Sequence, residues 1–269
     1  MRYSVNEIKN ILDSNNFIVS KSIIKLPECN IEHCLTDSRQ VSFIDTTLFV
    51  ALETNTGSGH KYIEDLYKQG VKNFLISIWE ASYENYNANF FLVDNTLKAL
   101  QALAMYHRDN FTSQAELFRF PIIGVTGSNG KTIVKEWLYQ LLSPERIITR
   151  SPRSYNSQIG VPLSVWLMNE KTEMGLFEAG ISEMGEMEVL QSVIRPTIGV
   201  LTNIGGAHQE NFYSLQDKCL EKLSLFKECD VVIYDGDNEL ISSCVSRCLL
   251  GAREIAWSRV DNERPLFIE

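Results

Sequence analysis

Several features are scarce in this sequence, and each absence excludes a class of protein or of partner. No stretch approaches the roughly eighteen consecutive apolar residues of a membrane span, and the Met1 end is amphipathic without the apolar core of a secretion signal. The six cysteines contain no close Cys-x-x-Cys pair and no small disulfide framework, which predicts reduced thiols in a cytoplasmic protein. The 25 Lys and Arg residues are outnumbered by 34 Asp and Glu, giving a net charge of −9. Binding to a nucleic acid backbone needs a basic face, so nucleic acid is not expected as the main partner.

The residues that are present indicate a folded globular chain. Its 269 residues are enough for two domains with a substantial hydrophobic core. With 44% hydrophobic and 22% charged residues, the composition is ordinary for a globular protein, so extensive disorder is not expected.

The strongest local signal is a glycine-rich turn between an apolar run and a helical pattern. Ile122–Val125 has the character of a buried strand, and Ile133–Leu142 has helical periodicity. Strand, turn and helix in this order are typical of a phosphate-binding loop, because glycines let backbone N–H groups converge on phosphate oxygens near a positive helix N-terminus. We therefore predict an ATP site made by Thr126, Gly127, Ser128, Asn129, Gly130, Lys131 and Thr132.

Two side chains of this turn suit phosphate chemistry. Lys131 can reach the β- and γ-phosphates, and the Thr132 hydroxyl can ligate Mg²⁺. The spacing departs from the common Walker form, which has glycine where this chain has Val125. A chance Gly-Lys-Thr in a surface loop is the alternative, and the flanking strand and helix argue against it.

The order of strand and helix patterns predicts an α/β fold. Residues 1–110 are expected to form a small α/β domain, residues 111–120 a linker, and residues 121–269 a phosphate-loop domain with a mostly parallel sheet flanked by helices. In the second domain the expected strands are Ile122–Val125, Gly175–Phe177, Ile198–Leu201 and Val231–Tyr234, and the expected helices are Ile133–Leu142, Glu186–Val193 and Leu215–Glu228. In the first, we expect a helix after a Ser4–Glu7 capping box, strands at Leu48–Leu52 and Val71–Ile78, and helices at Tyr62–Gln69 and Thr96–His107.

Ligands of parallel sheets bind at the carboxyl ends of the strands, so polar residues there are candidates for the site. Glu178 and Asp235 each end an apolar run and either suits a Mg²⁺ ligand; a capping or solvated carboxylate is an equal alternative for Glu178. His208 follows a Gly-Gly turn and can place an imidazole on a metal or phosphate. Lys222 lies in a predicted helix. A lone histidine is more often a hydrogen-bonded structural residue, and a lone lysine on a helix is more often solvated. His208 and Lys222 are therefore weak candidates when each is taken singly.

Together these segments resemble the Mur ligase family of ATP-dependent amino-acid and peptide ligases. Within it they are most similar to the branch that joins D-alanyl-D-alanine to UDP-N-acetylmuramoyl-tripeptide through an acyl phosphate. Six matching segments in family order make coincidence remote. They are Thr36–Arg39 with Leu48–Leu52 and Gly59-His60; Thr126–Thr132; Tyr155–Leu163; Glu178–Gly180 with Gly185-Glu186; Thr202–His208 with Glu210; and Glu221-Lys222.

The resemblance implies roles in metal binding and catalysis. Thr132 and Glu178 are similar to ligands of one Mg²⁺, and His208 to a ligand of a second. Lys222 matches the lysine that the family carbamylates, which converts an ammonium into a metal-binding carboxylate. Asp235 has no counterpart, so Glu178 is preferred for the metal role. The implied catalytic residues are Lys131, Asn156, His208 and Lys222.

The resemblance also implies the substrates. Ser38 and Arg39 belong to a segment similar to the family's uridine-nucleotide-binding domain, where a guanidinium can act as a bidentate donor; a turn with a surface arginine is the alternative. The expected partners are small molecules, UDP-N-acetylmuramoyl-tripeptide and D-alanyl-D-alanine, with ATP and Mg²⁺.

Two departures from the family pattern stand out. Ser157 occupies a position where many relatives have a second asparagine. The central domain looks incomplete at Glu269 and the family's third domain is absent, so we expect a fragment of a longer protein. The segment Ser154–Gln158 is similar to relatives fused to an alanine racemase, and pyridoxal phosphate is expected only if such a region follows.

Other functions are also compatible with the sequence. A sibling ligase that adds a diamino acid and a folylpolyglutamate-type ligase are the enzyme alternatives; Ser38, Arg39 and Gly59-His60 favour a UDP-linked acceptor over a folate. A non-catalytic nucleotide-binding module is the alternative outside the enzymes. A GTPase switch is disfavoured because the chain lacks Asn-Lys-x-Asp.

Overall fold

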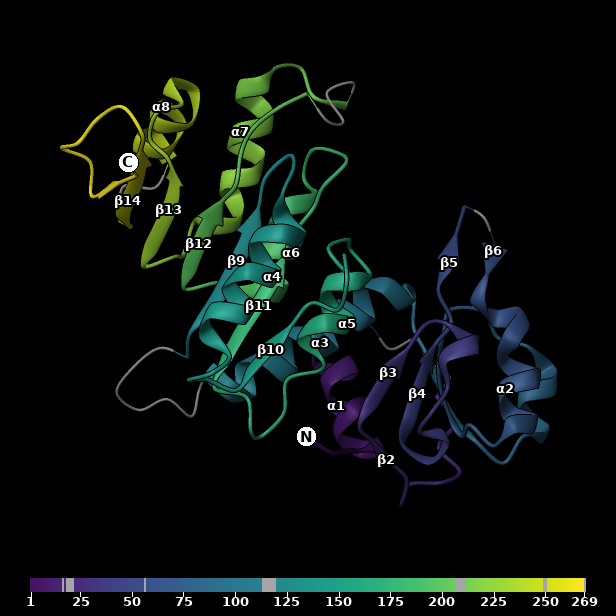
Figure 1. Ribbon diagram of the computed structural model, residues 1–269. Coiled ribbons are helices and arrows are strands. Elements are labelled where there is room, and N and C mark those ends of the chain that lie inside the picture. Colours follow the sequence, from purple (N-terminus) through teal and green to yellow (C-terminus); the bar gives the residue numbers. More distant parts are fainter. Residues whose placement is uncertain are drawn as a thin grey trace. The chain divides into compact units, whose positions relative to one another are not determined.

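The computed structural model in Figure 1 describes residues 1–15, 17, 22–55, 57–112, 120–206, 211–248 and 251–268. The chain divides into two compact units, Met1–His107 and Arg108–Glu269. All six cysteines are free. Among the described residues, no helix has the length and apolar character needed to cross a membrane.

The first unit is built on a four-stranded parallel sheet in the order β3-β4-β7-β8. Every residue of β4 and β7 is buried, which is the pattern of strands covered on both faces. Phe74 and Phe90 stack at 5.1 Å between ring centroids within its core. Its strands are β1 Tyr3–Ser4, β2 Asn30–Ile31, β3 His33–Leu35, β4 Thr47–Val50, β5 Glu53–Thr54, β6 Gly57–Ser58, β7 Asn73–Ile76 and β8 Asn89–Leu92.

Local sequence signals explain where the helices of this unit begin and end. In α1 (Val5–Ser14), Ser4 and Glu7 form the predicted capping box, each bonding the backbone N–H of the other. In α2 (Ile63–Gln69), Gly70 ends the helix with φ of 109°, a conformation that glycine adopts without steric cost. The third helix, α3 (Thr96–Thr112), runs five residues beyond its predicted end. The first two residues of the predicted linker, 111 and 112, are therefore helical, and 113–119 lie outside the described residues.

The second unit has a seven-stranded sheet in which all neighbouring strands are parallel, in the order β10-β11-β9-β12-β13-β14-β15. This confirms the predicted parallel sheet. Its strands are β9 Ile122–Thr126, β10 Ile148–Arg150, β11 Met174–Glu178, β12 Ile198–Leu201, β13 Val231–Asp235, β14 Arg253–Ser258 and β15 Leu266–Phe267. Its helices are α4 Lys131–Leu142, α5 Gly160–Val165, α6 Glu186–Ile194, α7 Leu215–Leu223 and α8 Glu239–Cys248.

Both faces of this sheet are covered, because successive residues of a strand point to opposite faces. On one face, Ile123 and Val125 pack with Val134 and Leu138 of α4. On the other, Gly124 and Gly199 are paired across β9 and β12, and a Cβ on Gly199 would lie 2.5 Å from the Phe226 ring. Phe226 belongs to the short 3-10 helix Ser224–Phe226, so the predicted helix Leu215–Glu228 ends as an α-helix at Leu223.

The strand order places the phosphate loop at the centre of the sheet. The chain leaves β9 through α4 toward β10 on one side, and it later returns through α6 to β12 on the other side of β9 (Figure 1). Such a reversal of strand order leaves a crevice at the carboxyl ends of the strands, where ligands bind in open parallel sheets. The predicted phosphate loop follows β9 at this point.

His60, in the first unit, generates a prediction about stability and pH. Its buried ring accepts hydrogen bonds at Nε2 from the backbone N–H groups of Ser77 and Ile78, at 3.0 and 3.1 Å, while Nδ1 lies 2.8 Å from Ser58 Oγ. Burial lowers the His60 pKa below its ordinary value. The unfolded imidazole thus binds a proton more readily than the folded one. The contribution of the neutral His60 ring to the free energy of unfolding is complete above about pH 6.5, and it is lost as the pH falls through the pKa of His60 in the folded protein.

We expect His60→Asn to lower the free energy of unfolding by about 1–3 kcal/mol at pH 7.5, because two partly buried backbone N–H groups each lose a hydrogen bond that contributes about 0.5–1.5 kcal/mol. The difference between wild type and variant should shrink at pH 5.5. Chemical denaturation followed by circular dichroism at both pH values measures it. A difference that does not change with pH would contradict the role assigned to His60.

Candidate active site

The turn between β9 and α4 has the backbone geometry of a phosphate loop. Gly127 has φ of 148° and Gly130, the N-cap of α4, has φ of 77°, both in the region that favours glycine. A Cβ on Gly127 would lie 2.0 Å from Thr202 Oγ1, so a larger residue does not fit there. The loop thus delivers the N-terminus of α4, with its unpaired backbone N–H groups, to the carboxyl edge of the sheet.

The segment after β12 holds this loop in place. Asn203 accepts hydrogen bonds from the backbone N–H of Ser128 at its carbonyl oxygen (2.8 Å) and from that of Asn129 at Oδ1 (2.9 Å). Thr202 Oγ1 donates to the Asn129 carbonyl at 2.6 Å, and the backbone N–H of Gly205 donates to Ser128 Oγ at 2.9 Å. The predicted Thr202–His208 segment therefore contacts the phosphate loop through its first residues.

Lys131 folds back over the loop. Its Nζ donates to the carbonyl oxygens of Gly127 and Ser128, at 2.9 and 3.4 Å. Burial lowers the pKa of this lysine, and the neighbouring Glu178 carboxylate acts in the opposite direction. The arrangement places a cation directly beside the α4 N-terminus, where both attract an anion.

Glu178 is the acidic residue that the structure brings to the loop. It ends β11, next to β9 in the sheet, and its side chain is fully buried. Its Oε1 accepts hydrogen bonds from Thr132 Oγ1 at 3.2 Å and from Asn156 Nδ2 at 2.8 Å. Asp235 ends β13, which β12 separates from β9, and its carboxylate accepts from the backbone N–H of Asp237. Of the two acids left open by the local pattern, only Glu178 is among the described contacts of the loop.

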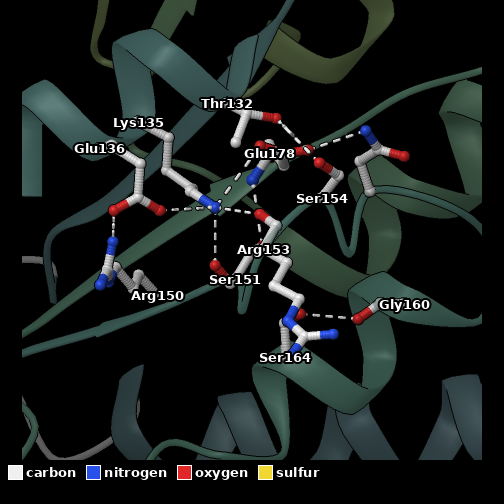
Figure 2. A network of polar contacts seen from close by, with 11 residues as sticks. Thr132, Lys135, Glu136, Arg150, Ser151, Arg153, Ser154, Gly160, Ser164 and Glu178 are labelled. Carbon is white, nitrogen blue, oxygen red and sulfur yellow. Dashed lines mark hydrogen bonds and ion pairs between the residues drawn. The ribbon is translucent and has the colours of Figure 1, made fainter.

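A second lysine of α4, which the sequence analysis did not identify, contacts the same carboxylate. Lys135 is completely buried, and its Nζ lies 3.6 Å from Glu178 Oε2 (Figure 2). It also donates to the carbonyl oxygens of Ser151, at 2.8 Å, and Arg153. Its position four residues after Lys131 puts both lysines on one side of the helix, and this spacing was the available signal.

Two lysines of α7 are also buried at this unit's core. Lys218 and Lys222 are 1% and 3% exposed, so the expectation that a lone helical lysine is solvated is wrong for Lys222. Burial, with the charges of Lys131 and Lys218, lowers the pKa of Lys222 to about 8. Lys218 Nζ donates to the Gly205 carbonyl at 2.6 Å. Lys218 was missed, although it shares the buried stripe of α7 with Cys219, Lys222 and Leu223.

Glu221, next to Lys222, has a structural role. Its Oε1 accepts from the backbone N–H groups of Gly185 and Met187 at 2.8 and 3.0 Å, which caps the N-terminus of α6. This contact fixes α7 against α6 and joins the Gly185-Glu186 and Glu221-Lys222 segments.

Three predicted site residues, His208, Ser38 and Arg39, are not part of this described cluster of the second unit. His208 lies outside the described residues, as does Glu210. Ser38 and Arg39 belong to the first unit, where the Arg39 guanidinium is 86% exposed and pairs with Asp37 at 2.8 Å. Donation from Arg39 holds the pKa of Asp37 at about 2.

The cluster suits an anion with a divalent cation. Positive charge comes from the α4 N-terminus and Lys131, and oxygen donors come from Thr132 and Glu178. Among the described residues, no three His, Cys, Asp or Glu side chains gather into a metal site.

The contact of Gly127 with Thr202 predicts the effect of a substitution. Gly127→Ala should lower the free energy of unfolding by about 1–3 kcal/mol, because the new methyl group overlaps Thr202 Oγ1 and the backbone conformation is strained. Gly206→Ala is the matched control, since a Cβ there meets no atom of the described residues within 4 Å. Denaturant unfolding of both variants, and of Gly127→Ala combined with Thr202→Ala, measures the effect. An equal decrease in the free energy of unfolding for the two single variants would rule out the steric explanation.

Known proteins are similar to this chain in sequence. Residues 125–248 match the family model described as the Mur ligase middle domain. The UDP-N-acetylmuramoyl-tripeptide–D-alanyl-D-alanine ligase of Bacillus subtilis is 34% identical over 216 residues, which are 78% of this chain and 45% of that protein. The chain spans about half the length of the curated relatives it matches.

Solved structures share the fold over most of the chain. MurF ligase from Thermotoga maritima in complex with ADP has a TM-score of 0.72 and 25% identity, covering 86% of this chain and 51% of that one. MurF from Acinetobacter baumannii has a TM-score of 0.80 at 19% identity, covering 96% of this chain and 54% of that one. The solved structures show the shared fold, and the family model together with the Bacillus subtilis relative shows that the chain belongs to the Mur ligase family.

Proposed function

We propose that the chain is the ATP- and substrate-binding part of a ligase of peptidoglycan precursor synthesis. The complete protein would join D-alanyl-D-alanine to UDP-N-acetylmuramoyl-tripeptide at the expense of ATP. The observation that carries this proposal is the contact between Thr132, at the start of α4, and the buried carboxylate of Glu178. It supports the proposal because it joins the phosphate loop to a buried acid that is suited to bind a cation.

The residues present fit a Mg²⁺ ion. The Thr132 hydroxyl and the Glu178 carboxylate are the oxygen donors that this ion prefers, and Glu178 Oε1 lies 3.2 Å from Thr132 Oγ1 at the start of α4. When bound there with the nucleotide, the ion would neutralise charge on the β- and γ-phosphates. His208 is proposed as a ligand of a second ion on the family resemblance alone.

Lys222 fits the proposed carbamylation. Only a neutral amine adds to carbon dioxide, with loss of a proton, and a pKa of about 8 leaves an appreciable neutral fraction near neutral pH. The carbamate would convert a buried positive charge beside Lys131 and Lys218 into a negative one. This change would remove the repulsion between Lys222 and the two other lysines, which is strong because the charges are buried.

The proposed reaction has two stages, and each brings negative groups together. The terminal carboxylate of the tripeptide attacks the γ-phosphate of ATP and forms an acyl phosphate with release of ADP. The amine of D-alanyl-D-alanine then attacks the acyl carbon and expels phosphate. Lys131 binds the phosphate oxygens during the transfer, and the N–H groups of α4 orient them. Asn156, bonded to Glu178 at 2.8 Å, lies beside this site and is proposed to contact the acceptor.

The first unit is proposed to bind the UDP part of the acceptor through Ser38 and Arg39. The Arg39 guanidinium is exposed, and its ion pair with Asp37 in the same turn contributes little to stability. The guanidinium could therefore leave Asp37 and bind a phosphate of the acceptor. The amine substrate and the adenine are proposed to contact a further domain. A sibling ligase and a non-catalytic nucleotide-binding module are the alternatives.

Calorimetric titration of the chain with UDP-N-acetylmuramoyl-tripeptide tests the proposal, with UDP, folate and Mg·ATP as comparison ligands. We expect binding of the UDP-peptide, weaker binding of UDP, none of folate, and binding of Mg·ATP. Mg·ATP binding without any binding of the UDP-peptide would retain the phosphate loop and reject the substrate. Folate binding would indicate the folylpolyglutamate-type alternative.

A further inference from the structure

We propose that Lys135 is a positioning residue that joins the Ser151–Asn156 segment to Glu178 and determines which Glu178 oxygen faces the phosphate loop. Figure 2 shows its ammonium group between the two, with contacts to both. The inference rests on the proposed function, in which Glu178 and Thr132 hold a divalent cation.

The position of Lys135 follows from α4. The helix begins at Lys131 beside the phosphate loop, and one turn later Lys135 points toward β10 and β11, where its side chain is 0% exposed. A buried ammonium is stable only when its three N–H donors find acceptors. Here the carbonyl oxygens of Ser151 and Arg153 accept hydrogen bonds from Lys135, and the carboxylates of Glu136 and Glu178 form ion pairs with it at 3.2 and 3.6 Å.

The two oxygens of Glu178 have different surroundings. Oε1 accepts hydrogen bonds from Thr132 and Asn156 on the side of the phosphate loop. Oε2 has no hydrogen-bond partner among the described residues, and its one ionic contact among them is with the Lys135 ammonium, 3.6 Å away. Lys135 therefore attracts Oε2 and leaves Oε1 on the side where the nucleotide and the cation are proposed to bind.

Lys135 also acts on the segment that carries Asn156. Arg153 adopts φ of 48°, a left-handed conformation that is unfavourable for a residue with a Cβ. Hydrogen bonds from Lys135 to the Ser151 and Arg153 carbonyls stabilise the chain on either side of this point. Three residues further on, Asn156 donates to Glu178. One ammonium group thus fixes both ends of the Asn156–Glu178 hydrogen bond.

A purely structural lysine would give a different experimental result from a positioning one. Loss of a structural contact lowers stability but leaves the response of nucleotide binding to Mg²⁺ unchanged. Loss of a group that orients a metal ligand typically lowers metal affinity by about 10- to 100-fold. The informative quantity is therefore the ratio of nucleotide affinities with and without Mg²⁺.

The test measures the affinity of this chain for a non-hydrolysable ATP analogue by calorimetry, with Mg²⁺ and with a chelator. We expect Lys135→Met to reduce the Mg²⁺-dependent gain in affinity by about 10-fold or more, with little change in the affinity without Mg²⁺. Glu136→Gln is the matched control, because Glu136 contacts Lys135 and Arg150 but has no described contact with Glu178. It should retain the gain. Lys131→Ala should lower both affinities.

Lys135→Gln and Lys135→Arg keep the proposal testable if the methionine variant does not fold. The arginine variant retains the charge and should keep most of the Mg²⁺-dependent gain, whereas the glutamine variant should lose it. A folded methionine variant with the wild-type ratio, or equal ratios for the glutamine and arginine variants, overturns the role of Lys135. A wild-type chain that binds no nucleotide in a Mg²⁺-dependent way overturns the proposed function, and the role of Lys135 falls with it.

Discussion

The buried carboxylate of Glu178 is the constraint on which the candidate site depends. A charge removed from water is stable only with close partners, and Glu178 finds them on separate elements: Thr132 and Lys135 on α4, and Asn156 on the segment after β10. These elements are far apart in the sequence, and the carboxylate holds them at one point beside the phosphate loop. We interpret this shared point as the centre of the proposed nucleotide and metal site.

The sheet provides the rigid frame for this point. Glu178 pairs with Val125 in the register of β11 and β9, so the acid and the start of the phosphate loop are side by side at the carboxyl edge. On the opposite side of β9, the segment after β12 bonds the loop through Asn203. Because both neighbours of β9 contribute, the geometry of the loop follows from the strand register and from the backbone and side-chain hydrogen bonds of the segment after β12.

The sequence was sufficient for features that depend on neighbouring residues. The capping box of α1, the glycine that ends α2 and the parallel arrangement of β9, β11 and β12 were predicted from local patterns and are present. The family resemblance, in turn, led to Glu178, which the pattern alone left equal to Asp235. Strand β10 has only three half-buried residues, and α5 has six residues with an internal proline, so neither gives a clear periodic signal. The four-residue spacing puts Lys135 on the same side of α4 as Lys131, but the burial of Lys135 and Lys222 was not predictable because it depends on tertiary partners.

The position of a divalent cation tests the central claim most directly. Crystals of the chain grown with Mn²⁺ and a non-hydrolysable ATP analogue would locate the ion by its anomalous scattering. The account predicts an ion about 2.1 Å from Thr132 Oγ1 and from a Glu178 oxygen, with the nucleotide phosphates on residues 126–132. An ion held by Asp235, or phosphates bound away from this loop, would contradict it.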